Sequence, residues 1–172
     1  MEYFKKVPHG IMFHHFHNKN HPNTQGSVSA EDLEKILNYV GRERILAPVE
    51  WLERLAENKL KPEDLCLTFD DGLLSQIEVA LPVLEHYDLK VFWFVYSGVF
   101  EGKLVNLEIY RFFRTKYFDN TDDFYNLFFE RFSESEMAAL SNPVLEEKGI
   151  KELRKTFQFY SKNDARFRFL RD

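Results

Sequence analysis

The first hundred residues alternate between short apolar runs and helical patterns. The runs 11–13, 65–69 and 90–95 predict three strands. The run 65–69, Leu-Cys-Leu-Thr-Phe, is almost continuously apolar, which is typical of a strand buried on both faces of a parallel sheet. Apolar residues at helical spacing between 33 and 40, and a proline at position 48, predict two helices after the first strand. A strand, a helix and a strand in this order favour a right-handed parallel crossover, so we predict an α/β fold.

Beyond residue 102 the pattern is helical. Helical spacing covers residues 107–117, 122–132, 134–140 and 143–157. The chain contains 18 Phe, and many of them lie between Leu104 and Phe132. Large aromatic side chains bury about 150–250 Å² each, so this stretch predicts a helical core, the alternative being a surface that meets a partner. We expect a domain boundary between residues 1–103 and residues 104–172.

Charge and composition narrow the class of protein. The chain has 28 acidic and 23 basic residues, which argues against a polybasic protein that binds nucleic acid. It contains one cysteine, Cys66, so no disulfide can form within the chain and a reducing compartment fits best. No segment approaches the ~20 apolar residues of a membrane-spanning helix. The expectation is a cytoplasmic protein without a membrane span.

Two groups of polar residues follow predicted strands, where α/β proteins place functional groups. One is Asp70-Asp71-Gly72, and the other is formed by three histidines, His14, His15 and His17. Adjacent carboxylates on a strand point to opposite faces, but Gly72 permits a turn that lets both face one pocket. Two carboxylates that close do not both ionise freely without a nearby cation, so the pair indicates a metal on one acid and a general base on the other. The alternative is that both acids cap the following helix.

The residues Thr68-Phe69-Asp70-Asp71-Gly72 resemble the first motif of the polysaccharide deacetylases, carbohydrate esterase family four, also called the NodB-homology fold. The flanking segments 65–67, 80–84 and 90–95 are similar to those of the family, as is the opening segment 11–17. The region from Gly10 to about Tyr117 resembles deacetylases linked to bacterial surface-polysaccharide synthesis.

The resemblance implies a distorted (β/α) barrel, incomplete in this chain, followed by the aromatic-rich helical segment. It also implies a hydrolase of linear amides that removes N-acetyl groups from a sugar or surface-polysaccharide precursor with a divalent metal, usually Zn²⁺. By this analogy Asp70 is the catalytic base, Asp71 is a metal ligand and Thr68 supports the loop. The three histidines and Thr68 are expected to line the substrate cleft.

The chain departs from the family pattern in its later motifs. The His-Ser/Thr-x-x-His motif that supplies two metal ligands is absent, as are the later Arg-Pro and Leu-x-His motifs. A catalytic zinc takes about three protein ligands, so low zinc occupancy is expected in this chain alone. Three explanations stay open: an N-terminal fragment, replacement of the missing ligands by the histidines of 14–17, or a degenerate homologue. The last would be a binding or assembly module without catalysis, which forms homo-oligomers through the Phe-rich helices.

Overall fold

The computed structural model describes residues 7–24, 26–140, 142–158 and 160–171. The chain divides into two compact units, Met1–Phe112 and Phe113–Asp172. The division lies within α4 (Asn106–Tyr117), nine residues beyond the boundary expected from the sequence.

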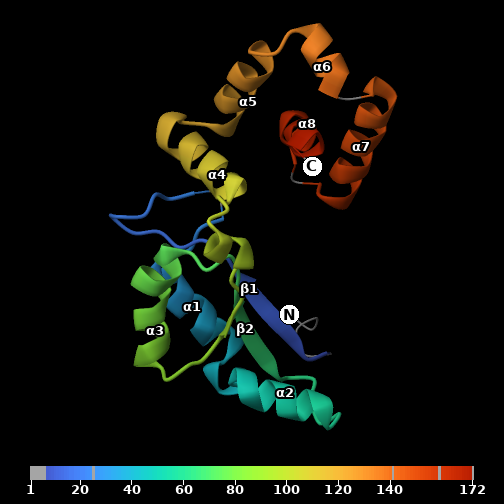
Figure 1. Ribbon diagram of the computed structural model, residues 1–172. Coiled ribbons are helices and arrows are strands. Elements are labelled where there is room, and N and C mark those ends of the chain that lie inside the picture. Colours follow the sequence, from blue (N-terminus) through green and yellow to red (C-terminus); the bar gives the residue numbers. More distant parts are fainter. Residues whose placement is uncertain (1–6, 25, 141, 159, 172) are drawn as a thin grey trace. The chain divides into compact units, whose positions relative to one another are not determined.

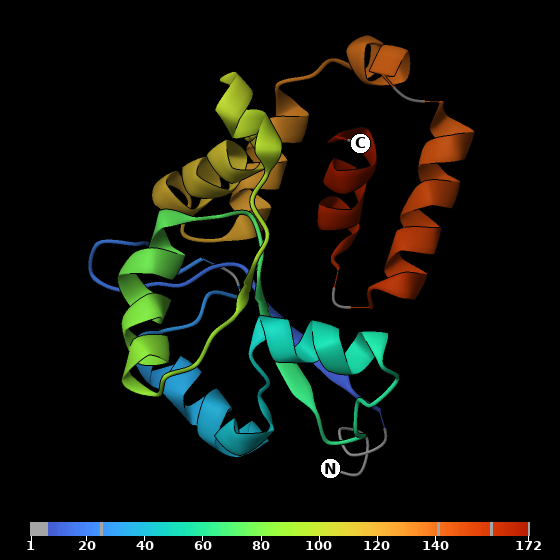
Figure 2. The ribbon, with the colours of Figure 1, turned by 60° about the horizontal axis from the view of Figure 1, so that its bottom comes forward.

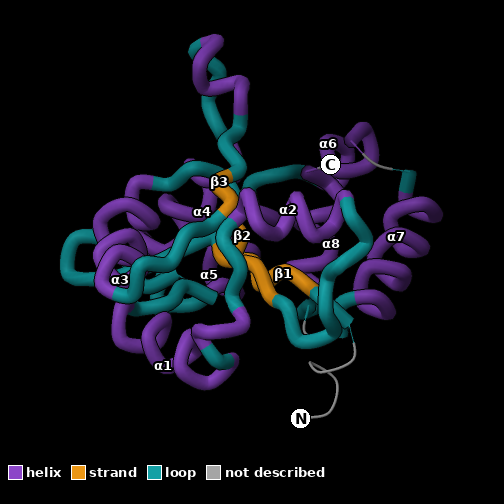
Figure 3. The backbone as a smooth tube through the Cα atoms, turned by 90° about the horizontal axis from the view of Figure 1, so that it is seen from below, coloured by secondary structure: helices purple, strands orange, loops and turns teal. Residues whose placement is uncertain are grey.

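The first unit contains a parallel sheet of three strands in the order β1-β2-β3 (Figure 3). The strands are β1 (His9–Phe13), β2 (Leu65–Phe69) and β3 (Phe92–Trp93). Their register places Phe13 beside Phe69 and Thr68 beside Phe92. The α/β class and the parallel crossover are confirmed. The third strand is shorter than the predicted 90–95, and the described residues form no further strand, so the barrel stays a prediction.

Helices and short helical turns surround the sheet of the first unit. They are α1 (Ala30–Val40), η2 (Arg42–Arg44), α2 (Pro48–Ala56), η3 (Gln76–Ala80), α3 (Leu81–His86) and η4 (Ser97–Glu101). The segment η3 is π-helical, whereas η2 and η4 are 3₁₀ helices. Helix α1 begins at its serine cap, because the Ser29 hydroxyl accepts a hydrogen bond from the main-chain amide of Asp32.

The core of the first unit lies against one face of the sheet. Leu33 and Leu37 of α1 are completely buried, and they belong to one apolar cluster with Leu67 and Phe69 of β2 and Leu84 of α3. Burial of this cluster holds β2 in place and therefore positions the loop that follows it. Figure 2 shows α1 and α3 on the same side of the strands.

The second unit is helical. After the end of α4 it contains α5 (Thr121–Glu130), α6 (Glu134–Leu140), α7 (Pro143–Thr156) and α8 (Lys162–Arg171). Phe124 and Tyr125 are buried, and the ring of Phe167 lies 5.5 Å from that of Phe124 and 5.1 Å from that of Phe128. These residues of the Phe-rich stretch therefore form the unit's own core. Oligomerisation through these helices stays a prediction.

In the described part of the chain, no helix combines the length and the apolar character needed to cross a membrane. The cytoplasmic location stays a prediction.

Candidate active site at the carboxyl ends of β1 and β2

The strand ends bring the two predicted groups of polar residues together. Because β1 and β2 are parallel and Phe13 lies beside Phe69, the residues that follow them leave the sheet at the same edge. The main-chain amide of Asp70 donates to the carbonyl oxygen of Phe13 at 3.1 Å, which extends the pairing by one step. His14 therefore lies opposite the Asp70–Asp71 pair.

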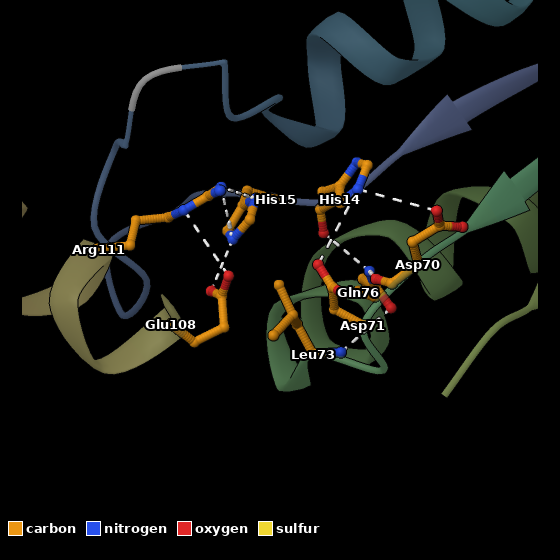
Figure 4. A network of polar contacts seen from close by, with 8 residues as sticks. All are labelled: His14, His15, Asp70, Asp71, Leu73, Gln76, Glu108 and Arg111. Atoms are coloured by element: carbon orange, nitrogen blue, oxygen red, sulfur yellow. Dashed lines mark hydrogen bonds and ion pairs between the residues drawn. The ribbon is translucent and has the colours of Figure 1, made fainter. Parts of the chain in front are cut away.

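Both carboxylates face the imidazole of His14 (Figure 4). The Nε2 atom of His14 lies 3.8 Å from Oδ2 of Asp70 and 4.0 Å from Oδ2 of Asp71. Asp71 has a φ of 76° and Gly72 has a φ of 64°, so two consecutive left-handed residues turn the chain. This turn lets adjacent acids share one side, as the glycine in the motif predicted.

The Asp70 carboxylate has one oxygen in need of a partner. Its Oδ1 atom is buried and makes no hydrogen bond among the described residues, whereas its side chain as a whole is 27% exposed. A buried oxygen of this kind costs free energy unless a donor or a cation reaches it. This buried oxygen favours a polar site at the pair over the alternative in which both acids only cap the following helix.

Gln76 connects the parts of the site through hydrogen bonds of its side-chain amide. Its side-chain Nε2 donates to the carbonyl oxygens of His14, at 2.8 Å, and of Asp70, at 2.5 Å. Its Oε1 accepts from the amide of Leu73 at 3.2 Å. Gln76 is completely buried and begins the π-helical segment η3, a distortion that is frequent at functional sites. One side chain thus connects the ends of β1 and β2 with the loop that follows β2.

His15 points into a second polar cluster. Its Nε2 lies 2.8 Å from Oε2 of Glu108, and its Nδ1 lies 2.5 Å from Nη1 of Arg111. The same Nη1 atom also lies 2.9 Å from Nε2 of His15, so the three side chains form one connected group. Burial acts to raise the pKa of Glu108, but the hydrogen bond from His15 and the adjacent positive charges outweigh burial and hold the pKa below its usual range.

The remaining predicted site residues lie elsewhere. His17 makes a hydrogen bond of 2.9 Å between its Nδ1 and the hydroxyl of Ser27. Thr68 is half-buried within β2, beside Met12 of β1 and Phe92 of β3. The structure therefore brings His14 to the acids, places His15 in the neighbouring cluster and gives His17 a separate partner. The cleft roles of these residues stay predictions.

A cavity of about 230 Å³ opens beside the second cluster. His15, Glu108 and Arg111 form part of its wall, and residues 73–75, which follow the turn at Asp71 and Gly72, form another part. It is smaller than the pockets that enclose drug-sized ligands, so it suits one substituent of a larger molecule.

The predicted zinc finds too few ligands among the residues that the structure describes. His14 and Asp71 offer two donors, whereas a catalytic zinc takes about three protein ligands and a water. Within residues 7–24, 26–140, 142–158 and 160–171, no group of three or more His, Cys, Asp or Glu side chains is placed to hold a metal ion. The unpartnered Asp70 oxygen fits a cation nearby but does not complete its shell. The residues present therefore do not fit a complete zinc site, and the zinc stays a prediction.

Sequence reasoning missed Gln76, Glu108 and Arg111. Gln76 lies six positions after Asp70, but Ser75 and Glu78 are polar residues of the same helical segment, so the sequence does not single it out. Glu108 and Arg111 form an i, i+3 pair, but nothing in the sequence links that pair to His15, which lies 93 positions from Glu108.

Comparison with known proteins gives two partial structural matches. No protein-family model matches the chain, and no curated protein matches it. The structure of IcaB from Ammonifex degensii is 26% identical, with a TM-score of 0.46, over 54% of this chain and 40% of that one. The Streptococcus pyogenes deacetylase PplD in complex with acetate is 28% identical, with a TM-score of 0.44, over 58% of this chain and 46% of that one.

The chain thus spans less than half the length of either solved structure. The second of these proteins is a deacetylase, the class that the motif at 68–72 resembles. Both TM-scores lie below 0.5, so we infer the function from the geometry of the site.

Proposed function

We propose that this chain carries the catalytic loop of a deacetylase-type hydrolase that removes acetyl groups from the amino groups of a carbohydrate. The observation that carries the proposal is the convergence of Asp70 and Asp71 on Nε2 of His14, within 4.0 Å, at the carboxyl edge of a parallel sheet. Ligands of open α/β sheets bind at this edge. The motif of residues 68–72, ending a buried strand, supports the acetylated sugar as substrate.

Asp70 is the proposed general base. Its partly exposed carboxylate takes a proton from a water molecule, whose oxygen attacks the acetyl carbonyl carbon. The carbon–nitrogen bond then breaks, the proton passes to the leaving amine, and acetate is released. His14 is the proposed partner that orients the Asp70 carboxylate and shares the proton. Asp71 is proposed as a metal ligand, with His14 as the other donor within reach, and the remaining ligands are not among the described residues.

The test is acetate release from oligomers of N-acetylglucosamine by the whole chain supplied with zinc. We expect release that Asp70→Asn lowers by about 10²-fold or more, the size of a lost general base. Asp119→Asn is the matched control, because Asp119 is exposed and lies outside the site. Equal rates in the wild type and Asp70→Asn would contradict the assignment.

The alternative is a binding module without catalysis, and the shortage of metal ligands favours it. The same oligomers distinguish the two functions when binding is measured beside release. Binding without release of acetate by the folded, zinc-supplied wild type would overturn the catalytic proposal in favour of the module.

A further inference from the structure

A groove of about 840 Å³ lies in the second unit, lined by residues of α7, of α8 and of the connection between them. The two helices lie side by side in both ribbon views (Figures 1 and 2). The volume falls within the range of sites that hold small molecules and cofactors. The groove belongs to the second unit alone and takes no part in the proposed catalysis.

The lining of this groove is basic, although the whole chain has a net charge of −5. Its five cationic residues are Lys151, Arg154, Lys155, Lys162 and Arg166. Two carboxylates also line it, and each is paired with a cation.

Each of the two carboxylates in the groove forms an ion pair with one of the cations. The Glu146 carboxylate lies 2.6 Å from Nε of Arg166, and the Glu147 carboxylate lies 2.8 Å from Nζ of Lys151. The other three cations, Arg154, Lys155 and Lys162, form no ion pair with a carboxylate in the described part of the chain. The groove therefore presents a surplus of three positive charges.

Three cations around one groove suit a phosphate group. A phosphate ester carries up to two negative charges and offers several strong acceptor oxygens, whereas a carboxylate carries one charge and two oxygens. Arginine binds phosphate oxygens through two parallel N–H donors, and lysine adds a mobile point charge. Apart from Pro143 and the buried Ile150, the lining is polar or charged, so no apolar anchor for a lipid surface is present there.

We propose that the groove between α7 and α8 binds a soluble ligand that carries a phosphate ester, with Arg154, Lys155 and Lys162 contacting its phosphate oxygens. Glu146 and Glu147 hold Arg166 and Lys151 at the walls, which leaves the three surplus cations available to the ligand. The site is independent of the proposed hydrolase activity.

Calorimetric titration of the whole chain with inorganic pyrophosphate, at low ionic strength, tests the proposal. We expect saturable binding with one site per chain. The triple variant R154Q/K155Q/K162Q is expected to bind about tenfold more weakly or worse, the effect of losing charge-assisted hydrogen bonds. The control K19Q/K61Q/K90Q removes three exposed lysines of the first unit and is expected to bind like the wild type.

The possible outcomes distinguish a specific phosphate-binding site from nonspecific electrostatic attraction. Absence of saturable binding by the folded wild type, or equal weakening in both triple variants, would overturn the proposal. Sedimentation with phosphatidylglycerol vesicles without pyrophosphate binding would also overturn it, because the phosphate would then be that of a lipid surface. If circular dichroism shows that R154Q/K155Q/K162Q does not fold, the single variant K162Q replaces it, with K90Q as its control. The expected weakening then applies to K162Q.

Discussion

Gln76 donates its side-chain amide to the carbonyl oxygen of His14, 62 positions earlier in the chain, at 2.8 Å. The same amide group reaches the carbonyl of Asp70, so the two halves of the candidate site share one support. The positions of the His14 imidazole and the two carboxylates relative to one another therefore depend on Gln76. Gln76 acts through main-chain carbonyl groups and not through these side chains.

Substitution of Gln76 by Leu removes three hydrogen bonds from a completely buried position. We expect a loss of about 2–3 kcal/mol in the free energy of unfolding, because main-chain groups lose their partners in the interior. Urea denaturation measures the loss. Gln158→Leu, at an exposed position, is the control and should change stability by less than about 0.5 kcal/mol. Similar stability in both variants would show that the Gln76 bonds do not support the strand ends.

Gly72 occupies a left-handed conformation in which a side chain would also collide. A Cβ there would lie 3.2 Å and 3.3 Å from the two γ-methyl groups of Val95, and φ is +64°. Gly102 has a similar φ, +75°, with no atom within 4 Å of its Cβ position. Gly72→Ala is therefore expected to lower the free energy of unfolding by about 1 kcal/mol more than Gly102→Ala does. The difference is the cost of the collision with Val95. Thermal unfolding of both variants measures it, and equal losses would contradict the close approach of Val95.

Glu108 makes stability depend on pH. Its pKa in the folded chain is lowered, since burial is outweighed by the hydrogen bond from His15 and by the charges of His15, Arg111 and His14. A lowered carboxyl pKa contributes stability that is present above the unfolded value and is lost as pH falls through the folded value. The stability difference between wild type and Glu108→Gln should therefore shrink between about pH 5 and pH 3.

Urea denaturation across this pH range makes the measurement for Glu108. Glu53→Gln, at an exposed position, controls for the general effect of removing an acid. A difference for Glu108→Gln that stays constant with pH would show that the His15–Glu108 pair does not stabilise the fold.

Tyr125 makes the stability of the second unit depend on pH, as Glu108 does for the first unit. Its hydroxyl donates to Asp164 and accepts from Nη1 of Arg114, and burial followed by the bond to Asp164 raises its pKa. A raised tyrosine pKa contributes stability that is present below the unfolded value, about 10, and is lost as pH rises through the folded value. Tyr125→Phe should cost about 1–2 kcal/mol at neutral pH, and this cost should diminish above about pH 10.

Chemical denaturation at neutral and alkaline pH measures the Tyr125 effect. Tyr117→Phe, whose ring is exposed, is the matched control. If both variants unfolded at the same denaturant concentration, the buried hydroxyl network would contribute nothing to stability.

Local signals account for what the sequence predicted correctly. The leucines of α1 and its cap at Ser29 are set by neighbours within four residues, and the apolar run of β2 identifies a buried strand without further context. The turn at Asp71 and Gly72 followed from the conformational freedom of one glycine. These signals were sufficient to place the two acids at a strand end.

Long-range packing accounts for what the sequence did not reveal. His15 and Glu108 meet only because α4 returns to the end of β1, and no periodicity encodes such a contact. The length of β3 depends on how many of its residues pair with β2, and only two do. The apolar run 90–95, from which the strand was predicted, is longer than that. His17 turns to Ser27 because the loop after β1 folds back to pair through Val28.

The most direct test of the account is a double-mutant cycle on acetate release with His14→Ala, Asp70→Asn and the double variant. If the two residues act as one unit, each single variant loses about 10²–10⁴-fold in rate and the double variant loses no more than the worse single one. Losses that multiply would contradict the account, because they would show that His14 and Asp70 act independently despite their 3.8 Å separation.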